Sequence, residues 1–322
     1  MINIAAAATL ALGLQVASST AVSPRFKSRA VAAVPTFPVR ASWQIILRNQ
    51  LQIPPTRPPI QPDTVDVWDI DLFENTDNGQ DPSAIQYLKS LPKKPQVICY
   101  FSAGSYEVDR TDWPANFDRD LYGKELVGWP GEYWLDINNT AVQDVMFNRI
   151  RLAAQLGCDA VDPDNVDGYG EAPSNPGNRT GKVFTLNQDK SVAFVQNMAR
   201  VAHENNIGIG LKNALEILGR VQGSVEFAVN EQCVEQKECS SYSTFVQTKP
   251  VFHIEYLPGA ENSHTPISNT TTQCTRYNEG TPQAPNLVDI TALSTVIKNM
   301  DLDGWVEFCD TTVKETELAP ES

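Results

Sequence analysis

The sequence predicts an α/β protein with a (β/α)₈ TIM barrel as its single domain. Three observations predict this fold: short apolar segments alternate with segments of helical periodicity, eight such apolar segments occur, and several of them end in carboxylates. Regular alternation of strand and helix indicates parallel βαβ units, and eight units favour closure into a barrel. A chain of 322 residues accommodates one barrel of about 250 residues with extensions.

Segments outside the barrel are expected at both ends of the chain. An apolar run over residues 4–17 precedes the small-residue pattern Ser19-Thr20-Ala21, which is typical of a secretory signal peptide over residues 1–21. Residues 22–42 are then a pro-segment or flexible lead-in, residues 43–312 the barrel domain, and residues 313–322 a C-terminal tail. No later segment reaches the roughly 18 apolar residues of a membrane span. We expect a secreted, extracellular monomer that does not bind a membrane.

Eight apolar segments are expected to form the barrel strands. They cover residues 65–73, 96–103, 132–138, 158–165, 208–213, 227–233, 250–257 and 304–309. Residues 140–156 place apolar side chains at the spacing of a helix with one buried stripe, and Gly157 follows as its stop. Residues 190–206 and 289–300 repeat this pattern and are also predicted to be helices.

The alternative architecture is an open, Rossmann-like sheet. It requires a glycine-rich phosphate loop after an early strand, and the sequence FSAGSYE at residues 101–107 does not supply GxGxxG. Two longer loops, residues 169–184 and 259–286, leave the ends of the fourth and seventh predicted strands. Both should therefore rise over the same rim of the barrel and shape a cleft there.

The charge of the chain limits its ligands. The formal net charge of −14 and the pI near 4.7 argue against nucleic acid, whose phosphates would be repelled, and agree with a neutral or cationic ligand. No cofactor or metal is expected, because the chain has no CxxC repeat or Cys/His grouping and only three histidines. The sequence DPDNVDG resembles a calcium loop, but Val166 breaks the alternation of ligands.

Six cysteines in a secreted chain suggest disulfides. Cys233 and Cys239 flank a short polar loop and are the best pair, and Cys274 with Cys309 is the next. The remaining two cysteines lie in apolar strand segments and are expected to be buried free thiols: Cys99 and Cys158. Three sequons give candidate glycosylation sites at Asn138, Asn178 and Asn269.

The segment GCDAVDPDNVDGYG, residues 157–170, runs from an apolar strand into several aspartates. Pro163 has no N–H for a sheet ladder, so the strand should stop near it, with Asp164 at the C-terminal rim. By the two-residue period of a strand, Asp162 shares the face of Asp164 and either supports the structure or binds substrate, whereas Asp159 points the other way and is structural. Asp167 either shapes the turn or binds ligand.

A second apolar strand, FAVNEQC at residues 227–233, also ends in a carboxylate, Glu231. Two carboxylates on one rim are what glycoside hydrolysis requires: one protonates the leaving oxygen, and the other attacks the anomeric carbon or activates water. The chain has no GxSxG, no HExxH and no obvious Cys/His pair. We expect crowding to raise the pKa values of these carboxyls, which would keep one of them protonated as the general acid.

Other polar residues near the predicted strand ends are candidates for substrate binding. Lys212 is as well explained by an ion pair among the acids as by substrate contact, and Asp136 and Glu307 are as well explained by membership of a polar network as by a catalytic role. The full set of substrate-binding candidates is Asp69, Asp71, Tyr100, Ser102, Asp136, Asp162, Asp167, Tyr169, Lys212, Asn213, Glu255 and Tyr256.

Seven motifs in consecutive order resemble one known family. They are WDIDLFEN (68–75), VICYFSAGSYE (97–107), WLDI (134–137), GCDAVDPDNVDGY (157–169), IGLKNA (209–214), NEQC (230–233) and HIEY (253–256). The sequence is similar to glycoside hydrolase family 114, the endo-α-1,4-polygalactosaminidases. The resemblance implies a (β/α)₈ barrel that cleaves α-1,4-linked galactosamine in a cationic exopolysaccharide. It implies Asp164 as nucleophile and Glu231 as general acid/base in a retaining mechanism.

Two other functions remain open at this point. The first is a glycosidase with another α-glycan specificity, which a groove without acids beyond the catalytic pair would favour. The second is a barrel that binds polysaccharide without cleaving it, which would be favoured if a buried basic residue locked the two carboxylates together with no groove beside them.

Overall fold

The computed structural model describes residues 33–53, 59–171, 184–256, 264–267 and 269–320. The chain divides into two units, Met1–Ala32 and Ala33–Ser322, and the described residues all belong to the second. The expected signal peptide, the first part of the expected lead-in and the sequon at Asn178 therefore lie outside the described residues.

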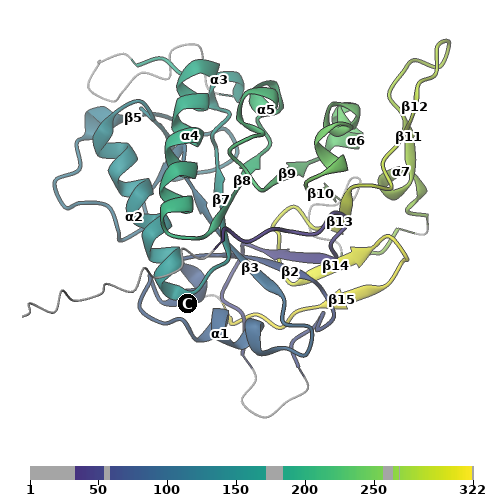
Figure 1. The fold of residues 1–322 in the computed structure, drawn as a ribbon, viewed down its shortest axis with the longest axis horizontal. Coiled ribbons are helices and arrows are strands. Elements are labelled where there is room, and N and C mark those ends of the chain that lie inside the picture. The colour runs from purple at the N-terminus through teal and green to yellow at the C-terminus, as the bar shows by residue number, and fades with distance from the viewer. Residues whose placement is uncertain (1–32, 54–58, 172–183, 257–263, 268, 321–322) are drawn as a thin grey trace, which may run out of the picture. The chain divides into compact units, whose positions relative to one another are not determined.

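Eight parallel strands form a curled sheet, which confirms the predicted (β/α)₈ barrel (Figure 1). The first and last of these strands come together through Trp43, whose Nε1 donates a hydrogen bond to the Ser294 carbonyl at 2.7 Å. In spatial order the strands are β1 (Trp43–Ile46), β2 (Val67–Asp71), β3 (Gln96–Ser102), β7 (Ala160–Asp164), β8 (Gly208–Lys212), β9 (Phe227–Glu231), β10 (Val251–Tyr256) and β13 (Ser294–Lys298).

Two of the eight predicted strands do not belong to the parallel barrel. Residues 132–138 contain β6 (Glu132–Leu135), which pairs with β4 (Ser105–Glu107) and β5 (Tyr122–Glu125) in a separate antiparallel sheet. Residues 304–309 contain β14 (Trp305–Phe308), which runs antiparallel to β13. It pairs in turn with β15 (Val313–Glu315), which lies within the expected C-terminal tail.

The predicted helix over residues 289–300 is wrong, because this segment supplies the eighth parallel strand, β13. Ile290, Leu293 and Ile297 repeat at a spacing that a helix also produces. The run Thr295-Val296-Ile297 is β-branched, however, and β-branched side chains pack well in a strand. The remaining parallel strand, β1, lies at the start of the barrel domain and was not among the eight predicted.

Helices cover the outer face of the sheet, and α2 and α4 pack side by side there (Figure 1). The predicted helix over residues 140–156 is confirmed, with Asn139 Oδ1 accepting from Ala141 N at its start and Gly157 at φ 98° at its end. The α-helices are α1 (Ser83–Ser90), α2 (Thr140–Leu156), α3 (Gly168–Glu171), α4 (Gln188–Glu204), α5 (Leu215–Val221), α6 (Cys233–Gln236) and α7 (Thr271–Cys274).

Short elements complete the connections between strands and helices. The 3₁₀ helices are Glu74–Thr76, Arg119–Leu121, Cys239–Tyr242 and Phe245–Gln247. The remaining two strands, β11 (Arg276–Asn278) and β12 (Leu287–Asp289), form an antiparallel hairpin that projects from the barrel (Figure 1).

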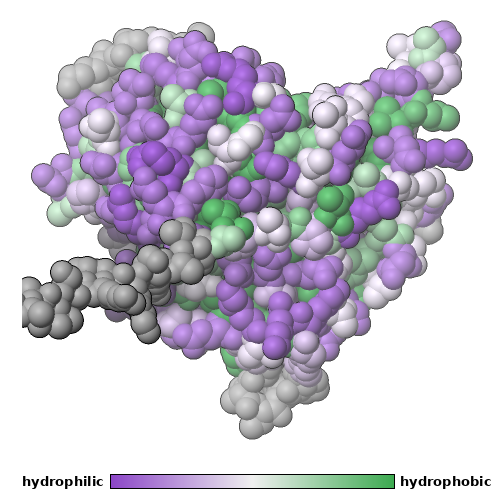
Figure 2. Space-filling view, in the orientation of Figure 1, coloured by the Kyte–Doolittle hydropathy of each residue, from purple (hydrophilic) through white to green (hydrophobic). Residues whose placement is uncertain are grey.

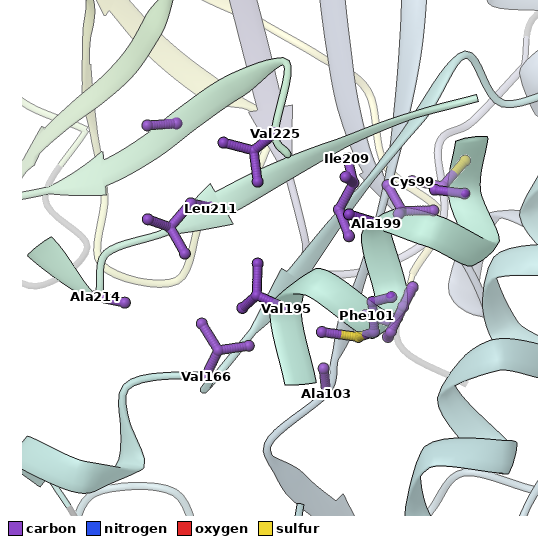
Figure 3. Packing of buried hydrophobic residues seen from close by; sticks show 14 of the residues in the cluster. Cys99, Phe101, Ala103, Val166, Val195, Ala199, Ile209, Leu211, Ala214 and Val225 are labelled. Atoms are coloured by element: carbon purple, nitrogen blue, oxygen red, sulfur yellow. The ribbon is translucent and has the colours of Figure 1, made fainter. Parts of the chain in front are cut away.

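The core has an outer layer between strands and helices and an inner layer inside the barrel. In Figure 3, Ala199 and Val195 of α4 lie toward Ile209 and Leu211 of β8, all buried in the outer layer. Inside the barrel, successive inward residues of one strand change from apolar to charged. On β7 they are Ala160, Asp162 and Asp164, and on β9 they are Phe227, Val229 and Glu231. The inside of the barrel is therefore apolar at the N-terminal ends of its strands and polar at their C-terminal ends.

Part of the expected lead-in closes the apolar end of the barrel. The Phe37 ring lies edge-on to Phe227 at 5.0 Å and to Phe252 at 6.3 Å between ring centroids. Phe37 and Ala41 are both buried in the inner layer. Residues 33–42 therefore contribute to the barrel's core.

Three disulfides are present: Cys233–Cys239, Cys274–Cys309 and Cys99–Cys158. The first two confirm the predicted pairs. The prediction of free thiols at Cys99 and Cys158 is wrong, because β3 and β7 are direct neighbours in the sheet. Had residues 132–138 formed a strand between them, as predicted, the two sulfurs would have been too far apart to join.

The face drawn in Figure 2 is mostly hydrophilic, with hydrophobic residues scattered over it. In the part of the chain that the structure describes, no helix combines the length and the hydropathy that crossing a bilayer requires.

Candidate active site

Three neighbouring strands, β7, β8 and β9, end in the charged residues Asp164, Lys212 and Glu231. In each case the next residue adopts the left-handed conformation, which turns the chain sharply away from the strand direction. Such a conformation costs a non-glycine residue roughly 1 kcal/mol or more and is found in turns and at functional sites. These turning residues are Asn165 (φ 59°), Asn213 (φ 48°) and Gln232 (φ 65°).

Lys212 lies between the two carboxylates and is 1% exposed. Its Nζ is 3.2 Å from Asp164 Oδ2 and 3.5 Å from Glu231 Oε2. It also lies 5.3 Å from the centre of the Tyr100 ring, within range of a cation–π contact. Burial alone would lower the pKa of Lys212, but the surrounding carboxylates raise it well above its ordinary value. Lys212 is therefore a charged bridge.

Hydrogen bonds fix the Asp164 carboxylate on both oxygens. Its Oδ1 accepts from Asn165 N at 2.7 Å, and its Oδ2 accepts from Tyr100 Oη at 3.1 Å. The Asp164 carbonyl accepts from Ala103 N at 2.9 Å and Gly104 N at 3.0 Å. A Cβ atom on Gly104 would lie only 1.7 Å from the Asn165 carbonyl oxygen, so only glycine fits this close approach.

The Glu231 carboxylate is held in a similar way. Its Oε2 accepts from Asn213 Nδ2 at 3.0 Å, and its Oε1 accepts from the Tyr256 hydroxyl. Burial alone would raise the pKa of Glu231, but Lys212, Tyr256 and Asn213 together hold it below its ordinary value. The expectation that crowding raises this pKa is therefore wrong for Glu231, because three donors stabilise its ionised form.

Asp69 of β2 and Asp162 of β7 are fully buried. Neither carboxyl accepts a hydrogen bond from another donor in the described part of the chain. They lie close enough to hydrogen bond with each other once one carries a proton. Burial is the main cause that raises the pKa of Asp162 to about 7 and that of Asp69 well above its ordinary value. The pair therefore retains a proton that exposed carboxyls would lose.

A cleft of about 670 Å³ opens beside Lys212 and the two carboxylates. Six carboxyl groups and a single lysine are the charged residues among its lining. One further wall is apolar, formed by Leu126, Val127 and Trp129. The six carboxyls belong to Glu132, Asp164, Asp167, Glu216, Glu231 and Glu238.

Comparison with known proteins identifies the family. The model of glycoside-hydrolase family GH114 matches residues 24–314. The chain belongs to this family. The structure of Aspergillus fumigatus Ega3 in complex with galactosamine is 37% identical in sequence, covers 86% of this chain and 98% of its own, and superposes with a TM-score of 0.69. The resemblance seen in the sequence is confirmed, and this GH114 member is a glycoside hydrolase.

A more distant structure agrees on the fold alone. The glycoside hydrolase domain of PelA from Pseudomonas aeruginosa is 11% identical, with a TM-score of 0.54 over 81% of this chain and 95% of its own. No protein of curated function matched the chain.

Eight of the residues predicted for the GH114 site line the cleft together. Tyr169 forms part of this lining and donates a hydrogen bond from its hydroxyl to Glu216 Oε2 at 2.9 Å. The full set is Tyr100, Asp164, Asp167, Tyr169, Lys212, Asn213, Glu231 and Tyr256.

Six other predicted site residues do not line the cleft. Asp69 and Asp162 form the buried pair described above. Asp71 accepts from the backbone N–H groups of residues 73 and 74 and forms an ion pair with Arg110 at 2.6 Å. Glu255 is 4% exposed and accepts from Val234 N at 2.9 Å. Asp71 and Glu255 are thus committed to local structure.

Ser102 and Asp136 are the remaining two. The Ser102 hydroxyl is buried, shares a hydrogen bond with Ser105 Oγ and accepts from Asn165 Nδ2 at 2.7 Å, so it supports the turn that follows Asp164. Asp136 follows β6, outside the parallel barrel, and its Oδ1 is buried without a hydrogen-bond partner among the described residues.

The structure adds lining residues that the sequence pattern did not reveal. Leu126, Val127, Trp129 and Glu132 come from the β5–β6 hairpin, which is an insertion between the third parallel strand and α2. Glu216 and Glu238 come from segments that follow β8 and β9. The turn sequence GWPG at residues 128–131 was the available signal for the hairpin, but nothing in it indicates which cleft the hairpin borders.

Among the described residues, one cluster has the spacing of metal ligands: Cys233, Cys239 and His253, and its two cysteines are joined in a disulfide. Their sulfurs are therefore not free to bind a metal as thiolates.

Proposed function

We propose that this GH114 enzyme is an endo-acting hydrolase of α-1,4-galactosaminidic bonds in a cationic, galactosamine-containing polysaccharide. Asp164 acts as the nucleophile and Glu231 as the general acid/base, and Lys212 holds the two groups in place. The observation that carries the proposal is the pair of carboxylates bridged by Lys212 at an open, acidic cleft.

The geometry at Lys212 supports a retaining mechanism. Because the ammonium lies 3.2 Å from Asp164 Oδ2 and 3.5 Å from Glu231 Oε2, these two oxygens cannot be farther apart than the two distances combined. Retaining glycosidases place their carboxyls about 5–5.5 Å apart, and inverting ones about 6.5–9.5 Å apart. For these two oxygens, which face each other across Lys212, the limit contains the whole retaining range and only the lower edge of the inverting range.

In the first step, Asp164 attacks the anomeric carbon and Glu231 donates a proton to the leaving oxygen, which yields a glycosyl-aspartate and a free chain end. In the second step, Glu231 removes a proton from water, the water attacks the anomeric carbon, and Asp164 is released. The lowered pKa of Glu231 means that its protonated form is more abundant on the acidic side of neutrality. We therefore expect the enzyme to work best at acidic pH.

The charge of the cleft supports a cationic substrate. Besides the proposed catalytic pair, four carboxyls line it, and Lys212 is the one cation among its described lining residues. Galactosamine units with protonated amines would be attracted to such a surface, whereas a neutral glycan carries no charge for these carboxylates to attract. The structure of Ega3, the 37% identical relative, is a complex with galactosamine.

Two alternatives are less well supported. A specificity for neutral α-glycans does not explain the additional carboxyls of the cleft. A barrel that only binds polysaccharide would be favoured if a buried basic residue locked the two carboxylates together with no groove beside them. Lys212 does bridge them, but a cleft lies directly beside the pair.

Secretion is part of the proposal. The apolar N-terminal run followed by small residues supports a signal peptide, and three disulfides fit an oxidising compartment.

The proposal is tested by incubating the purified protein with partially deacetylated α-1,4-galactosamine polymer and with a neutral α-glucan of similar length. We expect oligosaccharides of several lengths from the first substrate from the earliest times, as endo cleavage produces, and none from the second. Release of monosaccharide only, or equal cleavage of the neutral glycan, would contradict the proposed mode of action or specificity.

A further inference from the structure

The tip of the β5–β6 hairpin is a hydrogen-bonded turn at the border of the cleft. Leu126 N donates to the Glu132 carbonyl at 2.9 Å, and Glu132 N donates to the Trp129 carbonyl at 3.2 Å. Gly128 and Gly131 adopt φ values of 88° and 92°, a conformation that favours glycine. These backbone bonds fix the position from which the tip presents its side chains.

The hairpin tip carries apolar side chains that are exposed to solvent and do not pack in the core. Trp129 is 57% exposed and Val127 is 95% exposed, and both line the cleft. Trp129 is the single exposed tryptophan of the chain, since the other five are buried or partly buried. An indole left in water retains hydrophobic surface that a ligand can cover, and the faces of sugar rings are sufficiently apolar to do so.

Glu132 stands at the base of the same hairpin. Its Oε2 accepts a hydrogen bond from Ser105 Oγ at 2.8 Å, and no lysine, arginine or histidine of the described residues forms an ion pair with it. It lines the cleft with Asp164 and is close enough for the two charges to interact. Glu132 is therefore an anchored carboxyl that forms no ion pair among the described residues, although Arg110 is close enough to attract it, and it lines the same cleft as Asp164 and Trp129.

We propose that Trp129 and Glu132 form a sugar-binding subsite next to the catalytic pair, which takes one pyranose unit carrying a protonated amine. Trp129 stacks against the face of the ring, and Glu132 accepts a hydrogen bond from the ammonium group. This subsite rests on the proposed function, because the sugar it takes is a unit of the same polymer.

If this subsite exists, Trp129 determines how binding depends on substrate length, and Glu132 determines how it depends on the charge of the amine. Stacking depends on the ring and tolerates an N-acetyl group, whereas the contact with Glu132 requires the free amine. Loss of the Trp129 ring should therefore weaken the binding of every oligomer that is long enough to reach the hairpin tip. Loss of the Glu132 charge should weaken the binding of oligomers with free amines more than the binding of N-acetylated oligomers.

The test measures kcat/KM and, by calorimetry, binding for α-1,4-galactosamine oligomers of increasing length and for their N-acetylated counterparts. The variants are Trp129→Ala, Trp129→Phe and Glu132→Gln, the last of which keeps an acceptor for Ser105. Glu125→Gln is the matched control, because it removes the same charge from the same hairpin but lies outside the cleft lining. Glu125 Oε1 accepts from Gly131 N at 2.8 Å, and glutamine preserves this bond.

We expect Trp129→Ala to lower kcat/KM for long oligomers about tenfold and leave the shortest cleaved oligomer unchanged, a loss that Trp129→Phe largely restores. Glu132→Gln should lower it about tenfold for free-amine oligomers and less than twofold for N-acetylated ones, and Glu125→Gln should match the wild type. Equal kinetics for wild type, Trp129→Ala and Glu132→Gln at every length would overturn the subsite. If the wild type binds oligomers without cleaving them, the catalytic proposal fails, and the binding losses alone decide the subsite. If it binds none, both proposals fail.

Discussion

Replacing Lys212 with methionine tests how the site controls its proton donor. Methionine has nearly the length and shape of lysine without its charge. Lys212 Nζ lies 3.5 Å from Glu231 Oε2, and the ammonium is a cause of the lowered pKa of Glu231. Without this charge, the ionised form of Glu231 loses its principal stabilising partner, so its pKa should rise.

The size of the rise follows from the distance. Two unit charges 3.5 Å apart at an effective dielectric constant of about 20 attract by about 5 kcal/mol. At roughly 1.4 kcal/mol per pKa unit, this corresponds to an upper limit of about 3 units. Because the Glu231 side chain is 23% exposed, water replaces part of the lost interaction, and we expect a rise of about 1–2 units.

The assay is the pH dependence of kcat/KM on galactosamine oligomers. Activity falls as pH rises through the pKa of the general acid in the free enzyme, so a higher pKa moves this alkaline limb to higher pH. Lys212→Met should show this upward movement together with a lower maximum. Circular dichroism establishes that the variant is folded. A folded Lys212→Met whose alkaline limb stays in place or moves to lower pH would refute the assignment of Glu231 as the acid held by Lys212.

Three further predictions concern stability and the turn after Asp164. Removing the disulfide by replacing Cys99 and Cys158 together with alanine should lower the free energy of unfolding by about 4 kcal/mol, because it closes a loop of 59 residues; an unchanged midpoint in denaturant would contradict this. The pKa of Asp162 is 3.8 ordinarily and about 7 in the fold, so the folded state keeps a proton that the unfolded state loses, and wild-type stability should fall as pH rises between these values. Asp162→Asn should flatten this dependence in thermal unfolding, and an equal slope in both proteins would argue against the shared proton. Gly104→Ala should lower kcat by about 100-fold, since its Cβ would displace the Asn165 carbonyl, and a variant with wild-type kcat would show that the turn tolerates this displacement.

The sequence predicted the barrel because its strongest signals are local. The segments that became β7 and β9 are short apolar runs that end in carboxylates, and the period of two correctly placed Asp162 and Asp164 on one face. Asp159 points to the other face as predicted, where it accepts from Lys89 Nζ at 2.8 Å.

The errors in strand placement and disulfide pairing arose where the structure depends on which segments of the chain become neighbours in the sheet. Residues 132–135 form a strand, but their partners are β4 and β5, and no periodicity within the segment distinguishes a barrel strand from an insertion. The same misplacement hid the Cys99–Cys158 disulfide, because adjacency of β3 and β7 is a property of the assembled sheet.

Which residues line the cleft was predicted better than the charges that act on them. A row of acids at strand ends suggests mutual repulsion, and the sequence allowed Lys212 either an ion pair or substrate contact. The structure shows the ion pair, with Lys212 within reach of both carboxylates at once. Asp71 and Glu255 satisfied the same strand-end pattern but are occupied by Arg110 and by the turn at Val234, which are distant in sequence.

The central claim is that Asp164 and Glu231 together cleave the polymer. It is tested most directly by the rate of oligosaccharide release from partially deacetylated galactosamine polymer by wild type, Asp164→Asn and Glu231→Gln. Asp189→Asn serves as control, since Asp189 is an exposed carboxylate on α4 that pairs with Arg220. We predict losses of at least about 100-fold for the two site variants and none for the control. Wild-type rates in both site variants would contradict the account.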